Sequence, residues 1–194
     1  MSIKYIGITG KARAGKDTVC EMLCADLDCA VRYGLADPIK AAVFAMLGLD
    51  SLSERANLEA TKDETIPWLG RSFRDLVRSF GTSGRGIDED FWLCFLGKFS
   101  ESLIEMEACF SDADQHKPLY VIVPDVRYNN EANWIKERQG IILKVDREVE
   151  PVSPHHSENG ISVRYVDYVL DNSGNLEELK EKVQTIIKEE NLNE

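Results

Sequence analysis

One stretch near the N-terminus constrains this chain more than any other. Gly10-Lys-Ala-Arg-Ala-Gly-Lys-Asp-Thr18 follows a short apolar run, residues 3–9, and precedes a segment with the 3.6-residue apolar repeat of an amphipathic helix. Strand, G-x-x-x-x-G-K and helix in this order form the pattern of a phosphate-binding loop. The glycines let backbone N–H groups turn toward an anion, and the helix N-terminus adds unpaired N–H groups. Lys16 supplies a positive charge that can reach the outer phosphates.

One position of this loop departs from the common pattern. The residue after the lysine is usually Ser or Thr, whose hydroxyl binds magnesium, but here it is Asp17, followed by Thr18. The alternative is a glycine-rich turn before an ordinary helix, with Asp17 as a favourable acid in the first turn. The apolar strand before the loop and the amphipathic helix after it favour the phosphate-binding loop.

Composition limits the kinds of partner. The 194 residues are enough for one domain with a real core, and 43% hydrophobic and 29% charged residues are typical of a soluble globular protein. The net charge of -11, without a long basic run, argues against nucleic-acid and anionic-membrane binding, which need a positive surface. An anionic substrate must therefore bind in a local basic cleft.

The termini and the cysteines indicate a compartment. No signal peptide is visible, and no apolar run approaches transmembrane length. The five cysteines are odd in number and include no C-x-x-C pair, which suggests neither a disulfide framework nor a zinc site. We expect a reducing, cytoplasmic setting and no disulfide.

Short apolar runs alternate with helical periodicity along the chain. Strands are expected at residues 3–9, 30–35, 119–123, 141–145 and 165–170. Helices are expected after Lys16 and at residues 38–47, 72–80, 90–110, 130–139 and 176–190, with the helix at 72–80 ended by Gly81. Residues 50–70 are polar and irregular, with helix-compatible pieces. Alternating strands and helices predict an α/β fold with a mostly parallel sheet, in which ligands bind at the carboxyl ends of the strands.

Two residues follow the apolar run at 119–123. Asp125 ends this expected buried strand, where P-loop enzymes place an acid near magnesium or the acceptor. Arg127 offers a planar fork that suits a phosphate. The alternatives are an acid that caps the loop and a surface ion pair.

A local basic patch lies in the middle of this acidic chain. It consists of four arginines, Arg71, Arg74, Arg78 and Arg85. Arg74 and Arg78 share one face of the expected helix, so they could hold an anion or form an ordinary solvated face. Thr82 and Trp92 are candidate acceptor contacts, although a capping role and a core role are the simpler interpretations of each.

The loop His155-His156-Ser157-Glu158 lies between Arg147 and Arg164. Adjacent histidines point in different directions, and no third ligand has suitable spacing, so metal binding is disfavoured. The functional interpretation is a lid that excludes water from the phosphates, and a plain surface loop stays open as the alternative.

Several of these segments recur together, in this order, in one family. They are Gly10–Thr18, Ala36-Asp-Pro-Ile-Lys40, Arg74-Asp-Leu-Val-Arg-Ser-Phe-Gly-Thr82, Ile87-Asp-Glu-Asp-Phe-Trp92, Asp125-Val-Arg-Tyr-Asn-Asn-Glu131, His156-Ser-Glu158 and Asp167-Tyr-Val-Leu-Asp-Asn-Ser-Gly174. The whole chain resembles the deoxynucleoside monophosphate kinases of tailed bacteriophages. The Gly-Lys-Asp-Thr form of the loop is a feature of that family, so Asp17 is an expected residue.

This resemblance implies a three-layer P-loop fold of the nucleoside monophosphate kinase type and ATP-dependent phosphorylation of a deoxynucleoside monophosphate. The ATP positions are Gly10, Arg13, Ala14, Gly15, Lys16, Asp17 and Thr18. The acceptor positions are Ala12, Asp37, Ile39, Lys40, Arg74, Gly81, Thr82, Trp92, Asp125, Arg127 and Glu131. Catalytic roles fall to Lys16, Asp125, Arg127 and Arg147, with Asp17 and Asp125 as candidate Mg²⁺ ligands.

The resemblance also implies an organisation of the chain. It predicts one P-loop kinase domain over residues 1–194, with a helical acceptor-binding insertion at about 50–115 and a lid-like loop at about 147–164. Arg147 or Arg164 could close over the transferring group. The partners are ATP and a deoxynucleoside monophosphate, with no nucleic acid and no membrane, in the host cytoplasm if the protein is phage-encoded.

Some questions stay open at this stage. Arg78 stands where many relatives have glutamine, and the loop after Thr82 is one residue short, so the accepted base is undetermined. A homodimer is also left open. The last strand and the Asn172-Ser-Gly turn resemble dephospho-coenzyme A kinases as well, which makes another small metabolite the rival acceptor. A non-catalytic nucleotide-binding protein is the rival of another class.

Overall fold

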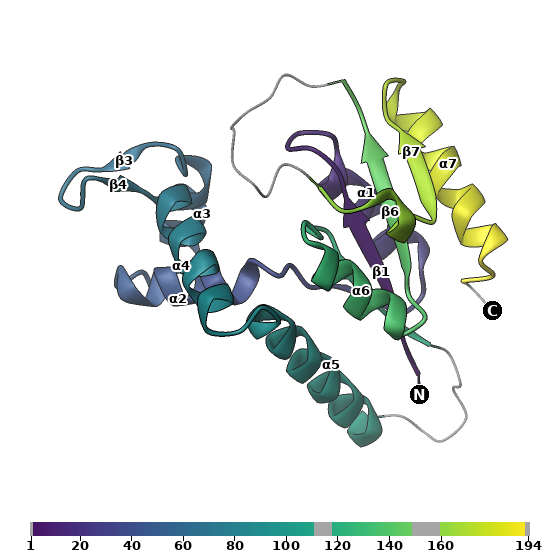
Figure 1. Cartoon of the computed structure of the whole chain (residues 1–194), viewed down its shortest axis with the longest axis horizontal. Coiled ribbons are helices and arrows are strands. Elements are labelled where there is room, and N and C mark those ends of the chain that lie inside the picture. Colours follow the sequence, from purple (N-terminus) through teal and green to yellow (C-terminus); the bar gives the residue numbers. More distant parts are fainter. Residues whose placement is uncertain (1, 111–117, 149–159, 193–194) are drawn as a thin grey trace. The chain divides into compact units, whose positions relative to one another are not determined.

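The computed structural model describes residues 2–110, 118–148 and 160–192 (Figure 1). The chain divides into two compact units, and each is described by itself. The first comprises residues 1–34 and 97–194, and the second residues 35–96. No helix in the described part of the chain is both long enough and apolar enough to cross a bilayer.

A five-stranded sheet forms the centre of the first unit, with every neighbouring pair parallel. The order is β2 (Ala30–Arg32), β5 (Leu119–Val123), β1 (Ile3–Thr9), β6 (Ile141–Asp146) and β7 (Tyr168–Asp171). The carboxyl ends of parallel strands meet at one edge of a sheet. The loops after β1, β5, β6 and β7 therefore leave from the same edge.

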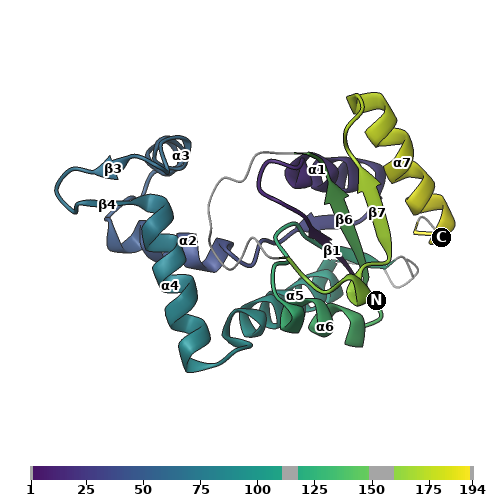
Figure 2. The same cartoon turned by 45° about the horizontal axis from the view of Figure 1, so that its top comes forward.

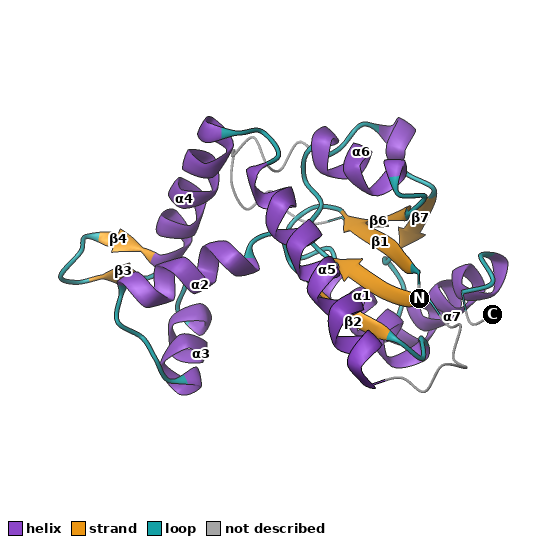
Figure 3. Ribbon diagram, turned by 90° about the horizontal axis from the view of Figure 1, so that it is seen from below, coloured by secondary structure: helices purple, strands orange, loops and turns teal. Residues whose placement is uncertain are grey.

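Helices cover both faces of this sheet, which gives three layers (Figure 3). Alternate residues of β1 serve the two faces, as the two-residue period of a strand requires. Ile6 and Ile8 join the core made with α1 (Lys16–Asp26) and α7 (Leu176–Glu189). On the other face, the Tyr5 ring meets Trp134 of α6 (Asn129–Glu137) edge-on, with ring centroids 5.0 Å apart. The sheet is therefore buried on both sides, as its apolar sequence predicts.

The second unit is largely helical (Figure 2). It contains α2 (Asp37–Met46), α3 (Leu52–Ala60), the short antiparallel hairpin β3 (Thr65–Ile66) and β4 (Arg71–Ser72), α4 (Phe73–Ile87) and the first turns of α5 (Phe91–Phe110). Its core is built on Val43, Phe44 and Phe73. The two phenylalanine rings stack with centroids 5.0 Å apart.

The predicted α/β class with a mostly parallel sheet is confirmed, and four local expectations need correction. The segment 50–70 is ordered: it holds α3, which starts at a capping box between Ser51 and Glu54, and the hairpin β3–β4. The last strand begins at Tyr168, because Val163–Tyr165 forms a 3-10 turn. The second strand is shorter than expected and ends at Arg32.

The fourth correction concerns α4, which was expected to end at Gly81 but continues through it to Ile87. Two of the three glycines in this extension, Gly81 and Gly84, are buried against other side chains. Trp92 donates its indole N–H to the carbonyl of Gly81 at 2.9 Å, and a Cβ on Gly84 would lie 2.6 Å from the Trp92 ring. Tertiary packing thus overrides the helix-ending signal of a glycine.

Candidate active site

The phosphate-binding loop needs glycine at both motif positions. Gly10 has a φ of 143°, and a Cβ there would lie 2.3 Å from the carbonyl oxygen of Val145. Gly15 has a φ of 102°, and its Cβ would lie 2.4 Å from Nδ2 of Asn172. Arg13, between them, also adopts the left-handed region, with a φ of 65°. Such conformations persist in non-glycine residues where the surrounding structure imposes them.

Lys16 begins α1 directly after the loop. Its Nζ donates to the carbonyl oxygens of Gly10 at 2.9 Å and Lys11 at 2.8 Å. The positive charge is therefore held on the loop itself instead of extending into solvent. The first-turn residues follow at once, with Asp17 exposed and Thr18 half-buried.

An asparagine near the C-terminus forms a hydrogen bond to the backbone of the phosphate-binding loop. The buried Asn172, which follows β7, donates through Nδ2 to the carbonyl oxygen of Ala14 at 2.7 Å. Ala14 is itself fully buried. Sequence reasoning assigned Asn172 no site role, although an Asn-Ser-Gly turn directly after a strand at the carboxyl edge was a usable signal.

The loop after β5 is held by an acid of α6. The buried Glu131 accepts hydrogen bonds through Oε2 from the backbone N–H groups of Arg127, at 2.7 Å, and Tyr128, at 3.1 Å. Val126 extends the pairing with β1 by donating to Ile8 at 3.1 Å. Asp125 is half-buried and Arg127 exposed in this loop. The contacts made by Glu131 position the backbone that carries Arg127.

Within the second unit, several of the expected acceptor residues are buried and one is exposed. Ile39 is buried and lies next to Gly81, Trp92 is buried with its N–H bonded to that glycine, and Thr82 is exposed. Ala12 of the loop and Asp37 at the start of α2 are half-buried. The indole of Trp92 packs on α4, in agreement with the simpler interpretation of this residue as part of the core, and its role as an acceptor contact stays a prediction.

The two expected acceptor cations of this unit each contact a carboxylate. Lys40 Nζ lies 2.9 Å from Oε1 of Glu59. Arg74 makes two contacts with Asp63, from Nε to Oδ1 and from Nη2 to Oδ2, the latter at 3.1 Å. Arg78 lies near Asp75, whose pKa is lowered by hydrogen bonds from Ser72 and, more weakly, by the charges of Arg71 and Arg78.

The expected lid lies largely outside the described residues. This holds for His155, His156, Ser157 and Glu158, which are not described. Arg147 is exposed directly after β6. Arg164 lies over the Tyr165 ring, 4.7 Å from its centroid, and donates to its hydroxyl at 2.8 Å. The lid stays a prediction.

Cysteine chemistry at the loop is disfavoured. Burial raises the pKa of the Cys20 thiol on α1 to about 12, and burial also raises the pKa of Cys24 one turn later. A thiol must ionise to act as a nucleophile or a metal ligand, so these two pack as apolar groups. Among the described residues, no cluster of three or more His, Cys, Asp or Glu side chains could hold a metal ion.

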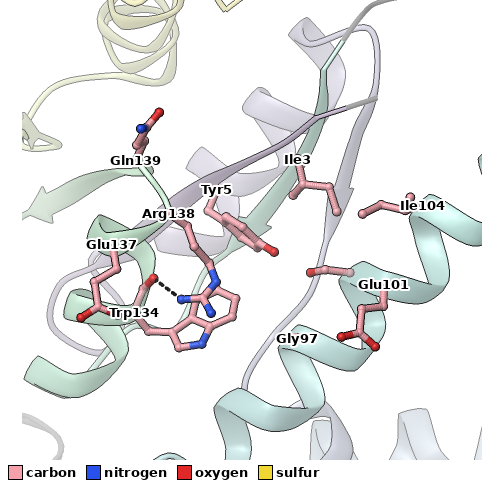
Figure 4. A pocket seen from close by; sticks show the side chains of 10 residues that line it. Ile3, Tyr5, Gly97, Glu101, Ile104, Trp134, Glu137, Arg138 and Gln139 are labelled. Atoms are coloured by element: carbon pink, nitrogen blue, oxygen red, sulfur yellow. Dashed lines mark hydrogen bonds between the residues drawn. The ribbon is translucent and has the colours of Figure 1, made fainter.

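A hollow of about 470 Å³ lies elsewhere in the first unit (Figure 4). It is lined by α5, α6 and the beginning of β1, including Ile3, Tyr5, Trp134 and Arg138. The Arg138 guanidinium lies over the Trp134 ring, 3.7 Å from its centroid. Ile3 begins the strand whose other end leads into the phosphate loop, so this hollow is separate from the candidate site.

Comparison with known proteins identifies the family. The family model for deoxynucleotide monophosphate kinase matches residues 4–67 and 60–183. The deoxynucleotide monophosphate kinase of Enterobacteria phage T4 is 25% identical, with 96% of this chain and 99% of that protein covered. A protein of Acanthamoeba polyphaga mimivirus is 26% identical, with 92% and 93% covered.

The fold also matches a solved structure, TT1252 from Thermus thermophilus. The match has a TM-score of 0.52 and 18% identity and covers 97% of this chain and 98% of that one. At this identity the likeness shows a shared fold alone. The phosphate loop at the end of β1, the parallel sheet and the family match agree. This chain is a phosphotransferase and belongs to the deoxynucleotide monophosphate kinase family.

Proposed function

We propose that this protein transfers the γ-phosphoryl group of ATP to a deoxynucleoside monophosphate. An oxygen of the acceptor phosphate forms a bond to the γ-phosphorus, while the bond from that phosphorus to the bridging oxygen of ADP breaks. The products are ADP and a deoxynucleoside diphosphate. The observation that carries the proposal is the phosphate loop, in which two positions require glycine and Lys16 holds its charge on the loop carbonyls.

The loop supplies the donor side of the reaction. Its backbone N–H groups and the N-terminus of α1 bind the ATP phosphates, and Lys16 neutralises charge on the outer phosphates as it is redistributed. Gly10, Arg13, Ala14, Gly15, Lys16, Asp17 and Thr18 form this set. Positioning and charge neutralisation supply nearly all the catalysis in phosphoryl transfer, because the protein forms no covalent bond to the transferred group.

The described residues fit a magnesium ion bound mainly through the nucleotide. Mg²⁺ usually takes one or two protein carboxylates together with substrate phosphates and water, so a three-ligand protein cluster is not required. The exposed Asp17 and the half-buried Asp125 offer the hard oxygen ligands that this ion prefers. When bound, the ion would neutralise charge on the β- and γ-phosphates.

Arg74, Arg127 and Lys40 bind the acceptor phosphate in this proposal. The guanidinium fork of an arginine matches the oxygens of a phosphate monoester, which a lysine cannot reproduce. Glu131 orders the backbone of Arg127, so it acts through that residue. Arg147 after β6 is assigned to the transferring group. A cytoplasmic location and a homodimer stay predictions.

Kinetics of arginine variants test this assignment. In Arg74→Ala and Arg127→Ala, the acceptor KM should rise first while ATP binding changes little, because both groups touch the acceptor phosphate in ground and transition states. Some loss of turnover should follow, since a loosely held acceptor attacks out of line. Arg→Lys variants should rescue poorly. Weaker ATP binding with unchanged acceptor KM and turnover would contradict the assignment.

Two rival functions are separated by simple assays. A dephospho-coenzyme A-like acceptor would be phosphorylated in place of a deoxynucleotide. A non-catalytic nucleotide-binding protein would bind ATP without multiple-turnover release of ADP that depends on an acceptor.

A further inference from the structure

Both acceptor cations of the second unit bind carboxylates from one short segment. Lys40 contacts Glu59 in the last turn of α3, with Nζ and Oε1 2.9 Å apart. Arg74 contacts Asp63, four residues further on, through Nε and Nη2. The segment 59–63 therefore offers one carboxylate to each cation that the proposed function assigns to the acceptor phosphate.

The Arg74–Asp63 contact reproduces the way an arginine binds phosphate. Two guanidinium nitrogens face two oxygens of one anion, the parallel arrangement that carboxylates and phosphates share. The backbone holds Asp63 in place: the N–H of Arg74 donates to the carbonyl oxygen of Lys62 at 2.9 Å, and Glu64 closes the turn on Thr61 at 2.8 Å. A phosphate oxygen pair that uses this fork must displace the Asp63 carboxylate.

Both ion pairs are exposed enough for another anion to replace the carboxylate. The side chains of Glu59 and Asp63 are 42% and 64% exposed, against 31% for Lys40 and 29% for Arg74. Exposed ion pairs contribute little stability, because water solvates the separated charges and ordering two long side chains costs entropy. A phosphate monoester carries up to two negative charges at neutral pH and three acceptor oxygens, so it competes well against a single carboxylate.

We propose that Glu59 and Asp63 compete with the acceptor phosphate for Lys40 and Arg74. They keep the two cations oriented and neutralised before the acceptor binds, and they raise the KM for the acceptor. A phosphate monoester can displace both carboxylates, whereas a neutral nucleoside leaves both ion pairs in place. This inference rests on the proposed function, because it takes Lys40 and Arg74 as acceptor ligands.

The test compares Glu59→Gln, Asp63→Asn and the double variant with the native protein. Binding of each deoxynucleoside monophosphate is measured by calorimetry without ATP, and KM and kcat are measured in steady state. Each single variant should bind the acceptor about two- to fivefold more tightly, the range expected for one exposed ion pair. The double variant should gain more than either single variant. ATP affinity should not change, and the binding of neutral nucleosides, which carry no phosphate to compete for the two cations, should be the same in the variants and the native protein.

Glu64→Gln is the matched control. It removes one negative charge from the same turn, next to Asp63, so it reports the general effect of lower net charge on anion binding. Its acceptor affinity should equal that of the native protein. An equal gain in the control would assign the effect to net charge and overturn the proposal.

Other outcomes also overturn it. Unchanged or weaker acceptor binding in folded Asp63→Asn and Glu59→Gln proteins, checked by circular dichroism and thermal midpoint, would make the two pairs purely structural. The proposed function fails separately, if the native protein phosphorylates no deoxynucleotide. In that case the ratio of acceptor affinities between variant and native protein still tests whether Glu59 and Asp63 compete with the acceptor phosphate. A double variant that binds no monophosphate would rule this competition out.

Discussion

At the scale of single residues, the motif predicts some of the contacts that hold the phosphate loop in place, but not all of them. Gly10 and Gly15 adopt positive φ values and approach a carbonyl oxygen and an amide nitrogen too closely for any side chain. These needs follow from the G-x-x-x-x-G-K pattern. The Asn172 contact could not be derived from the pattern, because its partner Ala14 lies 158 residues away. Only the parallel sheet brings the two together.

Lys16→Ala tests the charge on the loop. Loss of one well-placed charge-stabilising group costs roughly 3–4 kcal/mol in the transition state, so kcat should fall by about 10²–10³. The measurement is steady-state turnover at saturating ATP and acceptor, with folding checked by circular dichroism. A folded variant that keeps native turnover would show that Lys16 does not stabilise the transferring phosphate.

Asn172→Ala tests the support beneath the loop. It leaves the buried carbonyl oxygen of Ala14 without this donor, which costs about 1–3 kcal/mol and loosens the loop. We expect a lower free energy of unfolding together with weaker ATP binding by calorimetry.

Asn175→Ala provides the comparison. Asn175 caps α7 by accepting from Glu178 at 3.0 Å, so its loss should lower stability by about 0.5–2 kcal/mol and leave ATP affinity unchanged. If the two variants weaken ATP binding equally, Asn172 has no specific role in the loop.

At the scale of elements, sequence predicted what depends on local pattern. The central strands and the helices α1, α2, α5, α6 and α7 follow apolar periodicity and were expected close to their observed bounds. The predicted end of α4 at Gly81 was wrong. A glycine is a local signal for the end of a helix, but here Trp92, eleven residues later, packs against the glycines of a helix that continues. A local signal cannot report such packing.

Two glycines of α4 test this explanation. Gly84→Ala should lower the free energy of unfolding by about 1–3 kcal/mol, because its Cβ would lie 2.6 Å from the Trp92 ring. Gly86→Ala, with nothing within 4 Å, should be neutral or stabilise by up to about 1 kcal/mol through helix propensity. Denaturant unfolding measures both. A stabilising Gly84→Ala would contradict the packing of Trp92 on α4.

At the scale of the whole molecule, the family was accessible from sequence. The motif between β1 and α1 and the ordered segments after it were sufficient to identify it. The acceptor side was only partly accessible. Composition gives the arginine patch, but the pairing of Lys40 with Glu59 and of Arg74 with Asp63 depends on how α3 and the following turn fold back on α2 and α4. The sequence contains 34 aspartate and glutamate residues, and its pattern does not show which two of them form ion pairs with Lys40 and Arg74.

The most direct test of the central claim is one assay. Purified, folded protein is incubated with ATP and Mg²⁺ and, separately, with dTMP, dGMP, dCMP, dAMP or dephospho-coenzyme A, and the products are separated by ion-exchange chromatography. We predict ADP and a deoxynucleoside diphosphate in equal amounts with at least one of the four nucleotides. ATP binding without any deoxynucleoside diphosphate, or product from dephospho-coenzyme A alone, would contradict the account.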